Sequence, residues 1–119
     1  MKLTPEMLAT SYEFLRTTLP FKRWKLPHAD EVAFSVMVHQ KHMADHCVAR
    51  KQHAIRVAEN HIVSTDTLLC IMAHEMVHAY QDGVTHTGSR RVVHNKEFVR
   101  LGKRICAVHG WNINLFMGA

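Results

Sequence analysis

The chain has 119 residues, of which 15 are Lys or Arg, 10 are Asp or Glu, 11 are His and 3 are Cys. Because 47% of the residues are hydrophobic and 21% are charged, the composition excludes a disordered or collagen-like chain and fits one globular domain over residues 1–119. The longest apolar run, 68–73, is far shorter than the roughly 20 residues that cross a bilayer, so we expect no membrane partner.

The cysteines and the first residues of the chain bear on its compartment. Cys47, Cys70 and Cys106 are odd in number and widely spaced, which predicts neither a disulfide scaffold nor a zinc ribbon built on Cys-x-x-Cys pairs. Pro5 and Glu6 interrupt the region where a signal peptide would be apolar. We therefore expect a cytoplasmic protein, in the host cytoplasm if the source is a virus. The formal charge of +5 favours an anionic partner, although a solvated basic surface also explains it.

The first predicted element is a helix from Thr4 to about Thr18. Thr4 is a helix-capping residue, Pro5 suits the first helical position, and Pro20 ends the helix. A basic connection follows over 21–27. Three β-favouring segments, 32–38, 47–51 and 54–58, then predict a small antiparallel sheet.

Two more helices are predicted after the sheet. Ser64 begins the cap of a helix over about 65–82, which Gly83 closes. This helix is apolar on nearly every side, which predicts that it is buried. After a polar loop, a third helix over about 94–109 stops at Gly110. The segment that follows is too short and mixed in composition to assign.

The buried helix contains the HExxH motif, which here is His74-Glu75-Met76-Val77-His78. Residues four apart lie on one helix face, about 6 Å apart along the axis, so the two imidazoles can reach one metal ion. Glu75 is rotated by about 100° from His74, which places its carboxylate where it can take a proton from a metal-bound water. Three polar groups in an apolar helix are costly unless they share a partner, which favours a zinc site over hydrogen-bonded core residues.

A catalytic zinc site uses three protein ligands and leaves one position for water, so a third ligand is needed. The position six residues after His78 is Val84, which excludes a metzincin-type histidine. His94 shares the apolar face of the third helix, and we favour it as the third ligand. Glu97 is the alternative ligand, or a group that orients an imidazole, and His86 in the loop is a weaker candidate.

The HEMVH motif, followed by a loop and then by His94-Asn95-Lys96-Glu97-Phe98, resembles the SprT-like (Spartan-type) zinc metalloprotease family. The order of the elements before the motif is similar too, so the resemblance covers about residues 3–110. It implies an α+β, zincin-like fold with three helices and a small antiparallel sheet, in which HExxH lies on the central helix.

The same resemblance implies the roles of the motif residues. His74, His78 and His94 would hold one Zn²⁺ ion, and Glu75 would be the catalytic acid and base. Asn95 stands where the family usually has Gly, which is a departure from the pattern. No cysteine-rich zinc ribbon follows either, so any contact with DNA must be made differently.

A basic surface is the remaining candidate site. Lys96, Arg100, Lys103 and Arg104 lie on the face of the third helix opposite its apolar stripe, and Lys22 and Arg23 precede Trp24. A solvated surface accounts for these charges. The family resemblance favours contact with a phosphate backbone instead, and the ring of Trp24 could then stack on an exposed base.

Together these patterns predict a zinc metalloendopeptidase that hydrolyses peptide bonds of a protein substrate. The resemblance makes DNA-associated or DNA-crosslinked proteins a plausible substrate class. His86, Arg90 and Arg91 are candidates for stabilising the oxyanion, from their position in the loop alone. The alternative is a non-catalytic zinc-containing module that binds nucleic acid or protein, in which a fourth protein ligand closes the zinc site. An accessory or antagonist protein with a protease-like fold is a further alternative.

Overall fold

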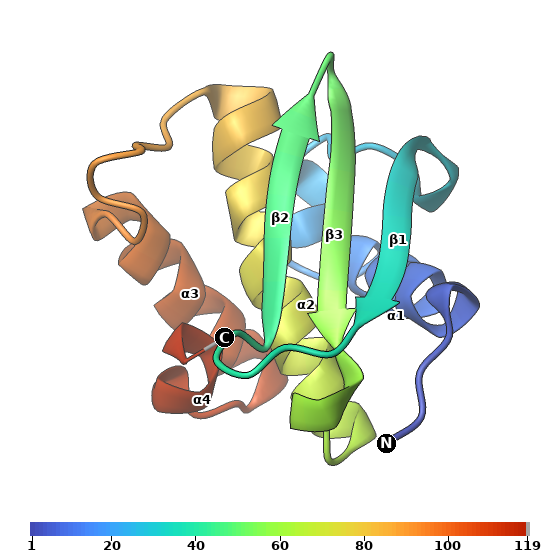
Figure 1. The fold of residues 1–119 in the computed structure, drawn as a ribbon. Helices are drawn as coiled ribbons and strands as arrows, with labels where there is room; N and C mark the ends of the chain where they lie inside the picture. The colour runs from blue at the N-terminus through green and yellow to red at the C-terminus, as the bar shows by residue number, and fades with distance from the viewer. Residues whose placement is uncertain (119) are drawn as a thin grey trace.

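A computed structural model describes residues 1–118 and shows an α+β fold in which helices cover one face of a three-stranded sheet (Figure 1). The strands are β1 (Val32–Met37), β2 (Ala44–Ala49) and β3 (Gln52–Ala58). The α-helices are α1 (Pro5–Arg16), α2 (Thr65–Tyr80), α3 (Lys96–His109) and α4 (Ile113–Met117). Within the described residues, no helix is both long and apolar enough to cross a membrane.

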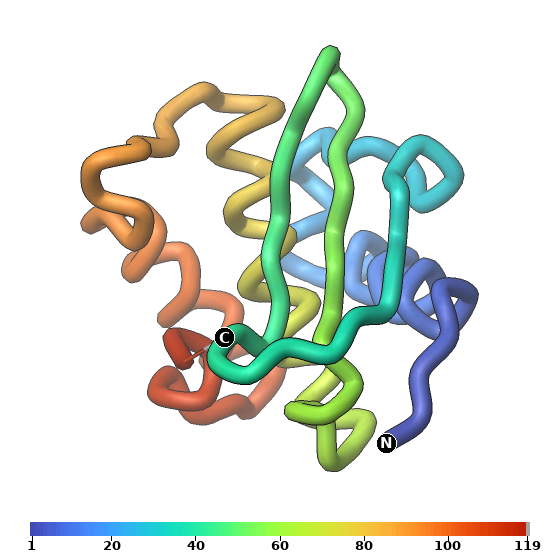
Figure 2. Tube along the Cα trace, viewed as in Figure 1, coloured from blue at the N-terminus to red at the C-terminus, as the bar shows by residue number. Residues whose placement is uncertain are grey.

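The sheet is mixed, which corrects the prediction of an antiparallel sheet. Its strand order is β1-β3-β2, in which β2 is antiparallel to β3 but β1 is parallel to it. The segment after β1 crosses the end of β3 before the chain enters β2 (Figure 2). β1 and β3 therefore run in the same direction. Strand-forming residues indicate where strands lie, but they do not indicate which neighbour each strand takes.

Alternate side chains of β3 face the helices. His53, Ile55 and Val57 are buried, whereas Arg56 points to the other face and pairs with Asp45 of β2. Helix α1 packs against β1, and α2 packs against β2. The core therefore lies between the sheet and these two helices.

Helix α1 begins where the sequence predicts. Thr4 caps the helix, and its side chain accepts a hydrogen bond from the amide of Met7 at 3.2 Å. After α1 the chain forms a short 3₁₀ turn, η1 (Phe21–Arg23), followed by Trp24. Trp24 is buried and stacks on Tyr80 at the end of α2, with ring centroids 4.2 Å apart. The connection that looks basic in sequence is therefore partly a core segment.

Helix α2 is the central helix, and its surroundings explain its apolar composition. It lies between the sheet on one side and α3 and α4 on the other (Figure 1). Ser64 caps it by accepting a hydrogen bond from the amide of Thr67 at 3.2 Å. A helix with neighbours on several sides needs apolar residues around most of its circumference.

The end of α2 differs from the prediction. The chain continues beyond Tyr80 as one wide π-helical turn, η4 (Gln81–Thr85), and leaves it at His86, whose φ is +57°. Gly83 lies inside this turn and does not close the helix. A Cβ atom at Gly83 would collide with the ring of His53, so the glycine allows the turn to pack directly on β3.

Helices α3 and α4 complete the side of α2 that faces away from the sheet. Asn95 caps α3 by accepting a hydrogen bond from the amide of Phe98 at 2.9 Å, so the helix begins two residues later than predicted. Gly110 ends it in the left-handed conformation, with φ of +77°, as predicted. The segment that the sequence left unassigned contains α4, whose Phe116 is fully buried.

Candidate metal centre

The two histidines of the motif lie close together on the α2 face that is turned toward α3. Their Nε2 atoms are 3.2 Å apart, and their ring centroids are 4.9 Å apart. His74 is only 1% exposed, whereas His78 is partly exposed. The four-residue spacing therefore brings both rings to one point in the folded chain, as helical geometry requires.

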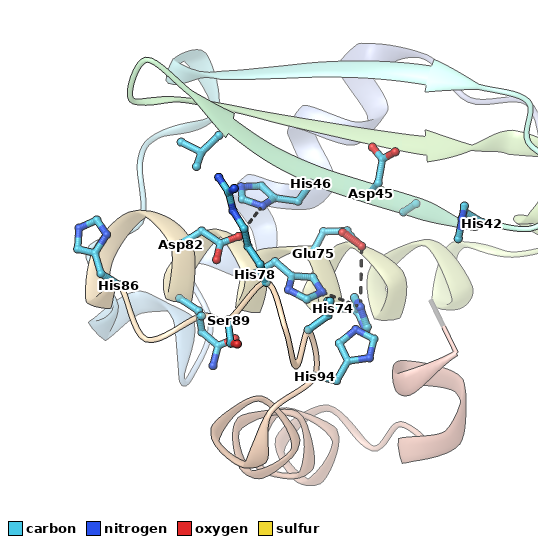
Figure 3. A pocket seen from close by; sticks show the side chains of 16 residues that line it. His42, Asp45, His46, His74, Glu75, His78, Asp82, His86, Ser89 and His94 are labelled. Carbon is cyan, nitrogen blue, oxygen red and sulfur yellow. Dashed lines mark hydrogen bonds and ion pairs between the residues drawn. The ribbon is translucent and has the colours of Figure 1, made fainter.

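His94 joins this pair from the segment that precedes α3. One nitrogen from each of His74, His78 and His94 lies within 4.8 Å of the other two. Figure 3 shows the three rings gathered between α2 and the start of α3. The ring of Phe98 packs against all three, with centroid distances of 4.6–4.8 Å. Phe98 therefore forms an apolar support under the cluster.

The other two candidates for third ligand lie elsewhere. The Glu97 carboxylate accepts a hydrogen bond from Gln81 Nε2 at 2.9 Å and another from Thr87. These contacts lower the pKa of Glu97, with the Thr87 hydrogen bond as the larger cause. His86 is exposed in the loop and, like Glu97, is not among the clustered residues. The structure thus places His94 beside the two motif histidines, whereas Glu97 is hydrogen-bonded to Gln81 and to Thr87 of the loop.

Gln81 is a residue that the sequence did not single out. It is 1% exposed, and its Nε2 donates to Asn95 Oδ1 at 3.0 Å as well as to Glu97. Asn95 Nδ2 in turn donates to the main-chain oxygen of Thr87 at 3.0 Å. We call these four residues, Gln81, Thr87, Asn95 and Glu97, the loop clamp. The clamp ties the end of α2 to the start of α3, on either side of the loop that precedes His94.

Glu75 is buried next to the histidine cluster. Its side chain is almost inaccessible, and Oε1 lies 3.9 Å from His74 Nε2 (Figure 3). Oε2 is buried and makes no hydrogen bond with the described residues. Burial, and to a smaller extent the charge of Asp45, raises the pKa of Glu75 to about 8. A buried carboxyl oxygen without a partner indicates a functional group that awaits a proton donor or a cation.

The cluster fits a metal ion by protonation and by distance. Burial, followed by the effect of neighbouring imidazoles, lowers the pKa of His74 to about 3 and that of His78 to about 4. Burial also lowers the pKa of His94. Neutral imidazole is the form that binds metals. Two nitrogens bound about 2.1 Å from one tetrahedral zinc lie about 3.4 Å apart, close to the 3.2 Å between His74 and His78.

A cavity of about 680 Å³ opens beside the cluster and is lined by Glu75 and the three histidines. Its far wall includes His46 of β2, which sequence reasoning also missed. His46 Nε2 lies 2.7 Å from His53 Nδ1, and His46 Nδ1 lies 3.5 Å from Asp82 Oδ2. Burial lowers the pKa of His46 to about 4, so this ring is neutral.

The cavity also separates the residues predicted to stabilise the oxyanion. His86 and Arg90 line it, whereas Arg91 is not among its lining residues.

The residues expected to bind nucleic acid lie on two elements. Lys96, Arg100, Lys103 and Arg104 are exposed on α3, and Lys22 and Arg23 are exposed on η1. Trp24 is a correction, because the residue is only 7% exposed and its ring is stacked on Tyr80, so it cannot stack on a base. Arg100 lies 4.0 Å from Glu97. A second hollow of about 500 Å³ is lined by His94 and by residues of α3 that include Lys96, Val99, Arg100 and Lys103.

Comparison with protein families gives one match. The model of the SprT-like family matches residues 6–116, which is nearly the whole chain. The searches of curated proteins and of solved structures find no match. The matched region contains α1, the sheet, the HExxH helix and the segment that carries His94.

Proposed function

The chain belongs to the SprT-like family, and from this premise and the three clustered imidazoles we propose that it is a zinc-dependent metalloendopeptidase with a zincin-like fold. The observation that carries the proposal is the pairing of this cluster with Glu75. Three neutral nitrogen ligands lie within 4.8 Å of one another, and a buried carboxyl oxygen without a partner lies beside them. In this proposal His74, His78 and His94 hold one Zn²⁺ ion.

Each group of the site has one chemical task. Zinc, when bound, supplies a Lewis acid that polarises a carbonyl group and makes water more acidic. Glu75 accepts a proton from a water molecule in the cavity at Oε1, the oxygen that lies 3.9 Å from His74 Nε2, and returns it to the leaving amine nitrogen. Its pKa of about 8 is raised by burial, and a cation held by the imidazoles would lower it again. A carboxyl group whose pKa lies near neutrality can both accept and donate that proton.

The alternative of a closed, structural zinc site is less well supported. Such a site has four protein ligands, whereas a catalytic site keeps one position open. Among residues 1–118, the cluster that could hold a metal contains three residues and no fourth. A cavity of about 680 Å³ also reaches this cluster, which leaves room for a substrate.

Substitution of Glu75 by Gln tests the catalytic proposal. We expect Glu75→Gln to keep the fold and zinc content, and to reduce cleavage of an unfolded protein substrate by at least about 100-fold, because the general base is lost. Glu6→Gln, at an exposed acid in the first turn of α1, is the matched control and should cleave as the wild type does. Equal activity of Glu75→Gln and the wild type would refute the proposal. A zinc-loaded wild type that cleaves nothing would favour the non-catalytic module.

We further propose that the peptidase acts on proteins associated with DNA, which the basic side chains of α3 would bind. The hollow of about 500 Å³ supports this, because its lining includes His94 together with Lys96, Arg100 and Lys103. A phosphate backbone bound there would lie close to the histidine cluster. A protein attached to that DNA would be held at a high effective concentration near the site.

A further inference from the structure

The ring of His74 is hydrogen-bonded to a part of the chain far from the motif. Its Nδ1 lies 2.7 Å from the main-chain oxygen of Phe116 in α4, 42 residues later in the sequence. A carbonyl oxygen can only accept a hydrogen bond, so Nδ1 must carry the proton. A neutral imidazole has a single N–H group, so the lone pair of His74 lies on Nε2, the atom that faces His78.

The position of that carbonyl oxygen depends on how α4 packs. With five residues, α4 is too short to be stable alone and needs tertiary contacts. The ring of Phe116 is fully buried and lies on Gly102 of α3, where a Cβ atom would approach the ring to 2.6 Å. The ring also lies 5.9 Å from that of Phe98, centroid to centroid. The missing side chain at Gly102 therefore sets how closely α4 approaches the cluster.

His74 differs in this respect from the other two clustered histidines. In the described part of the chain, neither His78 nor His94 has a hydrogen bond to the ring nitrogen that does not face the cluster. His74 is thus the clustered histidine whose outer ring nitrogen the protein holds by a hydrogen bond. Fixing the tautomer and orientation of a ligand in this way raises its affinity for a metal.

We propose that α4 is a positioning element of the metal centre, which acts through the Phe116 carbonyl on His74. By holding Nδ1–H, it presents Nε2 as a ready ligand, and the packing of Phe116 on Gly102 sets the strength of zinc binding. The inference rests on the proposed zinc site, and it assigns a role to α4, which contributes no ligand of its own.

Gly102→Ala tests this assignment, with zinc affinity measured by competition against a chromophoric chelator. The added methyl group should displace Phe116 and its carbonyl, and we expect zinc affinity to fall about 10- to 100-fold, as for other partners of ligating histidines. Gly102→Ala/Phe116→Leu should recover most of this loss, because the smaller side chain leaves room for the methyl group. Val108→Ala, at an exposed position of the same helix that belongs to no proposed site, is the control and should bind zinc as the wild type does.

Two results would overturn the assignment. One is a zinc affinity of Gly102→Ala equal to that of the wild type. The other is a Gly102→Ala/Phe116→Leu variant that binds zinc as weakly as Gly102→Ala, which would mean that the substitution weakens binding by disturbing α3 itself. If the wild type itself bound no zinc, the proposed function would fail first and this inference with it.

A second measurement has its decisive part in the wild type, so that part does not depend on how Gly102→Ala folds. In the zinc-free wild type, histidine ¹⁵N chemical shifts should show His74 as the Nδ1–H tautomer, with the signal assigned by its loss in His74→Gln. In Gly102→Ala the tautomer mixture should shift toward Nε2–H. A purely structural role of α4 would leave the tautomer unchanged, and an Nε2–H tautomer in the wild type would refute the inference.

Discussion

His74 and His78 belong to a helix that is buried along most of its length, whereas His94 follows a segment, 85–93, that is exposed throughout. The first pair is held by a helix packed between the sheet, α3 and α4. His94 is held by the loop clamp, in which Gln81 is the buried member. One side of the centre is thus fixed by core packing and the other by a few hydrogen bonds near the surface.

This difference separates two properties of the site. Core packing is cooperative, so the positions of His74 and His78 should persist for as long as the protein is folded. Surface loops open at a much lower free energy than the core, so the position of His94 can change without global unfolding. We therefore expect the first pair to determine whether zinc binds, and the clamp to determine how completely the third ligand is engaged.

The largest expected effect comes from removing ligands on either side. His78→Ala should reduce zinc from about one ion per chain to nearly none after dialysis, because only two ligands remain and one of them, His94, follows an exposed loop. His94→Ala should weaken zinc binding by more than the roughly 10- to 100-fold typical of an outer partner. Zinc content by mass spectrometry and affinity by chelator competition measure both.

Glu97→Gln is the matched control for His94→Ala. Because Glu97 belongs to the loop clamp and not to the histidine cluster, its amide should leave zinc affinity much closer to that of the wild type. If Glu97→Gln weakened binding more than His94→Ala, the third-ligand role would pass to Glu97.

The same comparison shows which parts of the site could be predicted from the sequence. The HExxH spacing is local to one helix, so the meeting of His74 and His78 could be predicted from helical geometry alone. The sequence also favoured His94 over Glu97, from the apolar face of the third helix, but it did not indicate the hydrogen bonds of Gln81 and Asn95 that hold the loop. In sequence, both residues look like ordinary polar positions at the ends of the helices predicted over 65–82 and 94–109. Asn95, a departure from the family pattern, is in the structure the cap of α3.

Long-range contacts account for the remaining errors. The parallel pairing of β1 with β3 depends on a crossing connection that residue preferences do not encode. Trp24 belongs to a basic stretch in sequence, yet it is buried because Tyr80, 56 residues away, stacks on it. The Phe116 carbonyl is a main-chain atom, so no side-chain pattern could have indicated its contact with His74.

A smaller effect is expected from loosening the clamp while all three ligands remain. Gln81→Leu removes the amide that donates to Asn95 and Glu97, and leaves their oxygens without this partner. We expect a cost of about 1–3 kcal/mol in the free energy of local opening, and a loss of zinc affinity that is smaller than the loss in the His94→Ala variant. Faster amide hydrogen exchange confined to residues 81–95 is the direct measurement.

Val92→Ala serves as the control for the clamp, because Val92 lies in the loop that the clamp holds but is exposed and has an apolar side chain that cannot hydrogen-bond to the clamp. It should leave both hydrogen exchange at 86–95 and zinc affinity near wild-type values. Equal protection of residues 81–95 in Gln81→Leu and the wild type would show that the clamp does not hold the loop. The two sides of the centre would then be alike in rigidity.

The smallest expected effect on the metal centre, and the one that tests the proposed partner, comes from the basic face of α3. Arg100→Glu/Lys103→Glu/Arg104→Glu should weaken binding of single-stranded DNA while leaving zinc content unchanged, since none of the three is a proposed ligand. If each wild-type side chain neutralises one phosphate, the slope of log affinity against log salt should become shallower by about 2. Lys2→Glu/Lys41→Glu/Lys51→Glu changes the net charge equally at other exposed positions, and it separates a specific surface from general attraction. Equal loss in both triple variants would mean that net charge alone attracts DNA.

If the α3 surface binds the DNA, the α3 triple variant should also cleave a DNA-bound protein more slowly, while cleavage of the same protein free in solution should change less. The reason is that only the DNA-bound substrate depends on being held near His94.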